Sequence, residues 1–125
     1  MTRVEIKSGS VTVQAELNDS ACAAKILDAL PLTATASTWG DEIYFDIGVP
    51  FKLAQSARDR MEVGEIAYWP PGKALCLFFG PTPVSDADGK PRAASPVIPV
   101  GRILGSPQLL KSVQDGDQIT VGRAE

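Results

Sequence analysis

The chain has 125 residues, 44% hydrophobic and 22% charged, with a formal net charge of −3. This length and composition predict one soluble domain over residues 1–125, and the acidic balance argues against nucleic acid as a partner. The chain contains no histidine, the usual general base near neutral pH and the commonest metal ligand.

Three further features limit the function. No apolar run approaches the roughly 20 residues that span a membrane, and the N-terminus lacks a signal-peptide pattern. We therefore predict a cytoplasmic protein with no membrane partner. Cys22 and Cys76 match no metal spacing and sit among apolar neighbours, so we expect buried thiols and neither a metal nor another cofactor.

The first half of the chain alternates polar and apolar residues, which is typical of half-buried strands. A helix from about Ser20 to Leu30, capped by Asn18 or Asp19, interrupts this pattern with apolar residues at helical spacing. The predicted strands cover residues 3–7, 11–17, 32–38 and 42–47.

The second half centres on a hairpin with strands at 65–69 and 74–79 around Pro70-Pro71-Gly72. Residues 51–63 are expected to form an irregular segment or a short strand. Five prolines in 81–99 predict a long surface loop. Strands at 100–104 and 118–122 then flank one helical turn that begins at Ser106-Pro107.

About eight short strands without βαβ alternation favour a closed barrel with one short helix and one helical turn. The interior of such a barrel is filled by side chains. We therefore expect any ligand at a mouth of the barrel or in a groove beside it.

Three segments carry a resemblance to a known family: GDEIYF at 40–45, GEIAYWPPG at 64–72 and LFFGPTP at 77–83. With VGRI at 100–103, they resemble a small prokaryotic family of stand-alone cyclophilin-like proteins. The resemblance implies a closed eight-stranded cyclophilin-like β-barrel and no particular activity. True cyclophilins carry a catalytic arginine in a Phe-His-Arg stretch and then a Phe-Met-x-Gln segment, and this chain has neither.

Glu42 and Tyr44 lie two apart on a predicted strand and therefore share a face, with Trp39 just upstream. On a concave face they would line one pocket with an acid, a phenol and an indole, a mixture typical of small-molecule sites. The alternative is that Ile43 and Phe45 face the core and leave Glu42 and Tyr44 in solvent.

Other candidates follow along the chain. Tyr68 and Trp69 point to opposite faces, so only one of them can line a given cavity. The bend at 80–85 offers hydroxyls to an anion or a carbonyl oxygen, or it is an ordinary proline-stiffened loop. Arg102 would pair with Glu42 or a substrate carboxylate, or it faces outward. The full set of candidate ligand-binding residues is Trp39, Glu42, Tyr44, Tyr68, Trp69, Phe79, Thr82 and Arg102.

Two functional hypotheses remain open. The first is a binding protein whose aromatic pocket holds a small molecule or an extended, proline-containing peptide. The second is an enzyme, either a peptidyl-prolyl isomerase or a small-molecule isomerase or hydrolase that uses Glu42 as acid or base. A homo-oligomer packed through its aromatic strands is a third interpretation of the same residues.

Overall fold

The structure is a computed structural model and describes residues 1–124. Within this range the chain forms ten strands and three short helices, so the prediction of a mainly β protein is confirmed. The strands are β1 (Thr2–Ser8), β2 (Val11–Leu17), β3 (Leu32–Thr35), β4 (Ser37–Thr38), β5 (Glu42–Asp46), β6 (Arg58–Arg60), β7 (Glu65–Trp69), β8 (Ala74–Phe78), β9 (Arg92–Leu104) and β10 (Gln118–Arg123). The helices are α1 (Ala21–Asp28) and the 3-10 helices η1 (Pro70–Gly72) and η2 (Pro107–Ser112).

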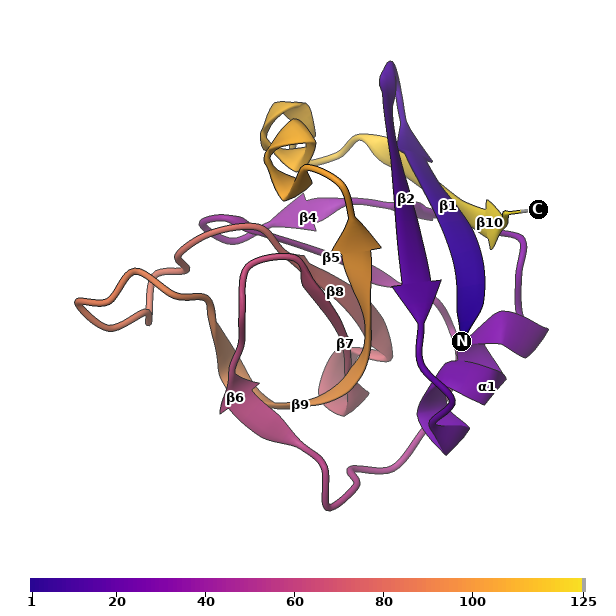
Figure 1. Cartoon of the computed structure of the whole chain (residues 1–125), viewed down its shortest axis with the longest axis horizontal. Helices are drawn as coiled ribbons and strands as arrows, with labels where there is room; N and C mark the ends of the chain where they lie inside the picture. The colour runs from indigo at the N-terminus through magenta and orange to yellow at the C-terminus, as the bar shows by residue number, and fades with distance from the viewer. Residues whose placement is uncertain (125) are drawn as a thin grey trace.

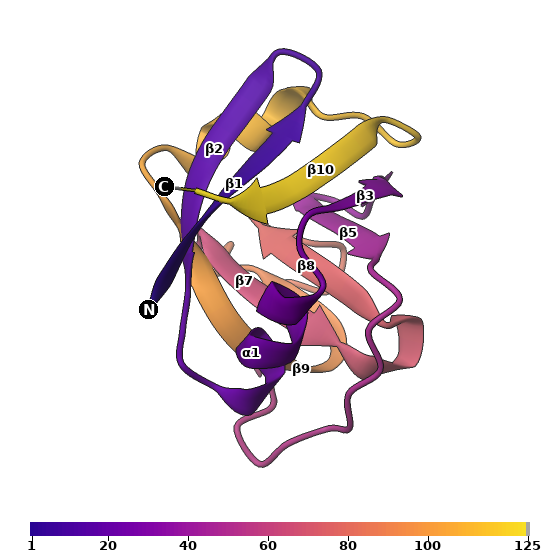
Figure 2. The same ribbon diagram turned by 90° about the vertical axis from the view of Figure 1, so that its right-hand side faces the viewer.

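The strands form one curved sheet, and the predicted closed barrel is wrong. Hydrogen-bonded neighbours follow the order β3-β10-β1-β2-β9-β7-β8-β5-β4, with β6 paired to β9 beside this path. Over the described residues no ladder joins β3 to β4, so the sheet has two open ends. Figures 1 and 2 show the sheet bending around the interior of the molecule.

The sheet stays open because the predicted strand 32–38 is broken at Ala36. Its first part, β3, pairs with β10, and its second part, β4, pairs with β5. At the break, the Ala36 N–H donates to the carbonyl of Asp117 at 2.8 Å, and the Ala36 carbonyl accepts from the Gly116 N–H at 2.8 Å. Since each residue has only one backbone donor and one acceptor carbonyl, Ala36 continues the pairing with the β10 side and not with β5.

One face of the sheet encloses the main hydrophobic core. The predicted hairpin of β1 and β2 alternates as expected and places Val4 and Ile6 inside. Helix α1 covers the core with Cys22 and Ile26. Full burial of a side chain such as Ile6 contributes roughly 1.5–3 kcal/mol to stability. The main core is therefore built in part from alternating apolar residues that can be recognised in the sequence alone.

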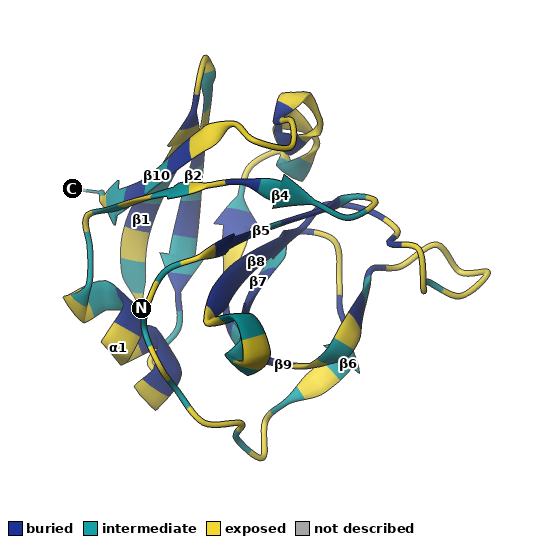
Figure 3. Cartoon of the chain, turned by 180° about the vertical axis from the view of Figure 1, so that it is seen from behind, coloured by how far each residue is buried: buried dark blue, intermediate teal, exposed yellow. Residues whose placement is uncertain are grey.

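The opposite face of β5, β8 and β7 carries a second apolar cluster. All five residues of β8 are buried, which requires cover on both faces of this strand. Figure 3 shows these strands in the dark blue of buried residues. The second cluster consists of Met61, Ala67, Cys76, Phe78, Ala93 and Val97, with Tyr44 and Trp69 packed against it.

The first half of β9, together with β6, covers this second cluster, so the predicted loop 81–99 is wrong from Arg92 onward. Strand β9 pairs with β6 through its first half and with β7 and β2 through its second. Pro99 sits where the register between β7 and β9 shifts, next to the pair of Ile66 and Gly101. Proline is tolerated at such an irregularity because a ladder hydrogen bond is already missing there.

The short helices follow the predicted positions with shifted ends. Helix α1 is capped by Ser20, whose Oγ accepts from the Ala23 N–H at 3.2 Å, and it ends at Asp28. Asn18, one of the predicted caps, instead accepts from the Ser20 N–H at 3.0 Å. The predicted turns at Pro70 and Pro107 form η1 and η2. None of the helices in the described part of the chain is long and apolar enough to cross a membrane.

Candidate functional site

Trp39 and Glu42 are held together by the tight turn between β4 and β5. The Trp39 N–H donates to the Glu42 carbonyl at 2.9 Å, and the Glu42 N–H donates to the Trp39 carbonyl at 3.2 Å. Gly40 lies inside this turn with φ of 59°, a conformation that glycine adopts without strain. The Trp39-Gly40-Asp41 segment therefore brings an indole next to a carboxyl group at the start of β5.

These two residues and Tyr44 line a cavity of about 250 Å³ on the second face of the sheet. The remaining walls come from Trp69 on β7 and from three small residues of β9, namely Ala93, Ala94 and Val97. Both tryptophans of the chain thus line the same cavity. The volume lies just below the roughly 300–1,000 Å³ of typical ligand pockets, so the cavity suits a small molecule.

Tyr44 and Trp69 form two nearly perpendicular walls of the cavity. Their ring centroids lie 6.4 Å apart with an angle of 78° between the planes, the edge-to-face arrangement that aromatic pairs prefer. The Trp69 Nε1–H donates to the Ser95 Oγ at 2.7 Å. Because its only donor is used in this way, the Trp69 indole has no free N–H for a ligand.

Glu42 is 6% exposed, although it belongs to a residue type that is almost never fully buried without a partner. Burial raises the pKa of the Glu42 carboxyl to about 7, and a hydrogen bond with the Cys76 thiol acts weakly in the opposite direction. Over residues 1–124 no lysine or arginine forms an ion pair with it. The carboxyl group is therefore poised to exchange a proton near neutral pH.

The two cysteines are free and buried, as predicted. Cys76 lies on β8, directly across from Tyr44 in the ladder with β5. Burial raises the pKa of the Cys76 thiol well above its usual value and raises the pKa of Cys22 to about 11. Both thiols are therefore protonated at neutral pH and behave as small apolar side chains.

Four of the eight candidate residues meet in this cavity, and Tyr68 and Phe79 do not. Tyr68 is fully buried in the main core, and its hydroxyl donates to the Val49 carbonyl at 2.5 Å. Phe79 also packs in the main core. Phe78 is the neighbour that lies on the Glu42 side, because it pairs directly with Glu42 between β5 and β8. Phe79, predicted as a ligand-binding residue, therefore belongs to the main core and does not line the cavity.

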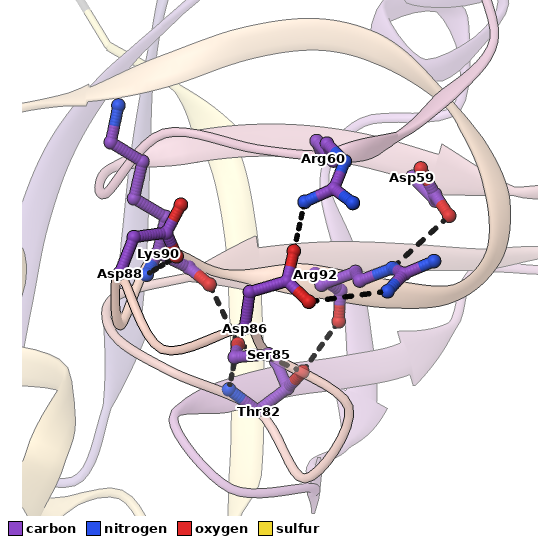
Figure 4. Close-up of polar contacts among 8 residues, drawn as sticks. All are labelled: Asp59, Arg60, Thr82, Ser85, Asp86, Asp88, Lys90 and Arg92. Carbon is purple, nitrogen blue, oxygen red and sulfur yellow. Dashed lines mark hydrogen bonds and ion pairs between the residues drawn. The ribbon is translucent and has the colours of Figure 1, made fainter.

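Thr82 and Ser85 hold their own loop together, as Figure 4 shows. The Thr82 Oγ1 donates to the Arg92 carbonyl at 2.5 Å, and the Thr82 N–H donates to Ser85 Oγ at 2.8 Å. The Ser85 hydroxyl in turn donates to the Lys90 carbonyl at 2.6 Å. These hydroxyls are engaged inside the loop, which favours the structural interpretation of this bend over an anion site.

Arg102 lies away from Glu42, so the ion pair with Glu42, one of the alternatives for this residue, does not form. Its side chain is 66% exposed, and its Nη2 lies 3.6 Å from Glu16 Oε1 across the β2–β9 ladder. Arg102 instead borders a separate shallow depression near Glu65. The alternative of an outward-facing strand residue is the correct one for this position.

Ala93, Ala94 and Val97 are the wall residues that the sequence did not suggest. The surrounding prolines predict a surface loop at these positions. The available signal was that Ala93, Val97 and Ile98 are apolar. This is compatible with a strand if Pro96 and Pro99 occupy irregular positions in it. Ala93 and Ala94 follow Arg92 directly in sequence, and Val97 follows on the same strand.

An ionic network anchors this wall of the cavity. Arg92 Nε lies 3.3 Å from the Asp59 carboxylate on β6, and Arg92 Nη1 lies 3.7 Å from Asp86 in the loop. Arg60 also pairs with Asp86, and Figure 4 shows both guanidinium groups converging on this carboxylate. Exposed pairs of this kind contribute only about 0–1 kcal/mol each to stability. The main effect of the network is therefore to position the β9 wall of the cavity.

The fold and site together define a small protein with a curved antiparallel sheet and a single buried acid in an aromatic pocket. The sequence matches the model of the cyclophilin-like family over residues 2–122, and the chain belongs to that family. It is also similar to the hypothetical protein AF2241 from Archaeoglobus fulgidus, known from a solution structure. The identity is 44%, the TM-score is 0.84, and the match covers 98% of this chain and 95% of that one. A comparison with curated proteins gave no match.

Proposed function

We propose that the protein binds a small organic molecule in the cavity between Trp39, Glu42, Tyr44 and Trp69. The observation that carries this proposal is the pairing of apolar aromatic walls with one buried carboxyl group that has no ion-pair partner within residues 1–124. Binding sites combine apolar walls with a few polar groups that orient the ligand. A volume of about 250 Å³ favours a small molecule over several residues of an extended peptide.

The two tryptophans make this proposal directly testable, because both line the cavity. A library of small polar and aromatic compounds is titrated against the intrinsic fluorescence of the protein. We expect at least one compound to shift the emission saturably. The Ala94→Leu variant adds bulk to the cavity wall at an exposed position and should abolish the shift.

Ala24→Leu is the matched control, since Ala24 is exposed on α1 and does not line the cavity. It should bind as the unmodified protein does. Saturable binding that survives Ala94→Leu, or no fluorescence response to any compound, would contradict the proposal.

A catalytic role for Glu42 is the second candidate function. A general acid or base works best when its pKa lies near the working pH, and burial brings the Glu42 pKa to about 7. The peptidyl-prolyl isomerase version has less support, because the cavity wall contains no arginine and Arg102 lies elsewhere. A shared fold is only an analogy for activity. A protease-coupled assay on proline peptides, with Glu42→Gln alongside, tests that version.

A further inference from the structure

We propose that the ligand of this pocket is a small organic cation, with an ammonium group held between the aromatic rings and the Glu42 carboxylate. The inference rests on the proposed function and specifies the chemical class of ligand. It is drawn from three properties of the cavity: the orientation of the rings, the unpaired acid and the small apolar residues of β9.

The rings come from three different parts of the chain and line one cavity. Trp39 comes from the β4–β5 turn, Tyr44 from β5 and Trp69 from β7. The faces of aromatic rings carry negative potential and attract a cation within about 6 Å of the ring centre, most strongly for tryptophan. The 78° angle between Tyr44 and Trp69 lets one group contact the face of one ring while the other ring closes the side.

The polar groups of the cavity favour a ligand that carries positive charge. The Trp69 N–H is already bonded to Ser95, so it is not free to donate to an acceptor group of a ligand. Glu42 is 6% exposed and has no ion-pair partner among residues 1–124. A buried carboxylate without a counter-charge is costly, and a bound ammonium group supplies the missing charge.

The β9 wall suits methyl groups or methylene groups on that cation. Ala93, Ala94 and Val97 present small apolar surfaces, which do not solvate a strongly hydrated ion such as a metal. A metal ion would also require several oxygen or nitrogen ligands, and the cavity offers a single carboxyl group. Alkylated ammonium groups combine charge with apolar surface, so they match both the carboxylate and the small apolar residues of the cavity.

The groups around Glu42 also predict how pH affects binding. The titratable side chains facing it are the Tyr44 phenol on its own strand and the Cys76 thiol on β8, while β7 and β9 contribute Trp69 and the small apolar residues. No basic group from these elements lines the cavity. Because a cation binds the ionised carboxylate, its affinity should rise with pH up to the Glu42 pKa of about 7 and level off above it.

The test compares choline with its uncharged isostere 3,3-dimethylbutan-1-ol, which replaces the quaternary nitrogen by carbon and keeps the shape. Tryptophan fluorescence is titrated at constant ionic strength at pH 6 and pH 8. At pH 8 we expect choline to bind at least about tenfold more tightly than the isostere. We also expect the affinity for choline, and not for the isostere, to rise severalfold from pH 6 to pH 8.

Glu42→Gln separates charge from shape in the same cavity. It should lower the affinity for choline severalfold and abolish its rise from pH 6 to pH 8, because the attraction of the rings remains but does not titrate, and Ala94→Leu should block both probes. Equal or tighter binding of the isostere to the unmodified protein would overturn the inference while the proposed function stands. If neither probe binds but another compound does so in an Ala94→Leu-sensitive way, the inference is wrong and the binding function remains. If no compound binds, both are wrong.

Discussion

Gly40 lies directly against Thr82, so that a Cβ added to Gly40 would stand 2.9 Å from the Thr82 Cα. This contact joins the turn that carries Trp39 and Glu42 to the loop that follows β8. The Asp41 N–H donates to the Pro81 carbonyl at 2.9 Å beside it. The turn that carries Trp39 and Glu42 is therefore held against this loop by one close backbone approach.

Gly40→Ala should destabilise the protein by two separate effects. The positive φ of 59° costs an alanine roughly 1–2 kcal/mol, and the clash with backbone atoms of the loop adds about 1–3 kcal/mol. Gly9→Ala is the matched control, because Gly9 has φ of 58° and nothing within 4 Å of its added Cβ. Urea unfolding should show a clearly larger loss for Gly40→Ala, and equal losses would mean that the loop moves away freely.

The buried carboxyl of Glu42 should make stability fall as pH rises. Its pKa is about 7 in the folded protein and near 4.5 when exposed, so the folded state binds the extra proton between these values. The stabilisation is present below pH 4.5 and is lost as pH rises through 7. The loss amounts to about 3 kcal/mol. Urea unfolding of Glu42→Gln should lack this slope between pH 5 and 7.5, whereas Glu62→Gln, at an exposed position, should retain it.

The ion pair between Arg58 and Glu65 should hold β6 against β7. The guanidinium is bidentate, with Nη1 3.0 Å from Oε1 and Nη2 2.5 Å from Oε2 of Glu65. Arg58 is 44% exposed on its side chain, so we expect Arg58→Ala to cost only about 1 kcal/mol at low salt and less in high salt. Arg102→Ala, whose contact with Glu16 is longer and more exposed, should change the free energy of unfolding by less than about 0.5 kcal/mol. Losses of the same size for both variants would contradict this assignment.

Tyr68→Phe should change stability without changing the pocket. The variant loses the hydrogen bond to the Val49 carbonyl, at a cost of about 1–2 kcal/mol in thermal or urea unfolding. Its affinity for any compound that binds the pocket should be unchanged, because the ring lies in the main core. Tyr44→Leu should do the reverse, with a small effect on unfolding and a severalfold loss of affinity. Weakened binding by Tyr68→Phe would show that the two faces of β7 are coupled.

Much of the fold was readable from the sequence because alternation reports on local geometry. The hairpin of β1 and β2, the β7–β8 hairpin and the placement of Glu42 and Tyr44 on one face all follow from the two-residue period of a strand. The same period correctly separates Tyr68 from Trp69. It does not say which face of β5 is the main core, because both faces of this region are covered.

The errors arose where distant segments decide the local structure. Residues 92–99 are a strand because β6 and β7 pair with them, despite a proline content that favours a loop. The segment 32–38 is broken because Ala36 bonds to the turn at Gly116 and Asp117. Neither partner is visible in a local pattern, so the loop and the closed barrel were predicted in their place.

The amino-acid sequence by itself determined the class of protein, the family, and the residues that share a face of each strand, because these depend on composition and on a local period. Only the tertiary structure decided that the sheet stays open and that Glu42 is buried. It alone also showed that the β9 residues Ala93, Ala94 and Val97 complete the pocket. Those properties depend on which distant strands pair, and long-range pairing is a property of the whole chain rather than of any one segment.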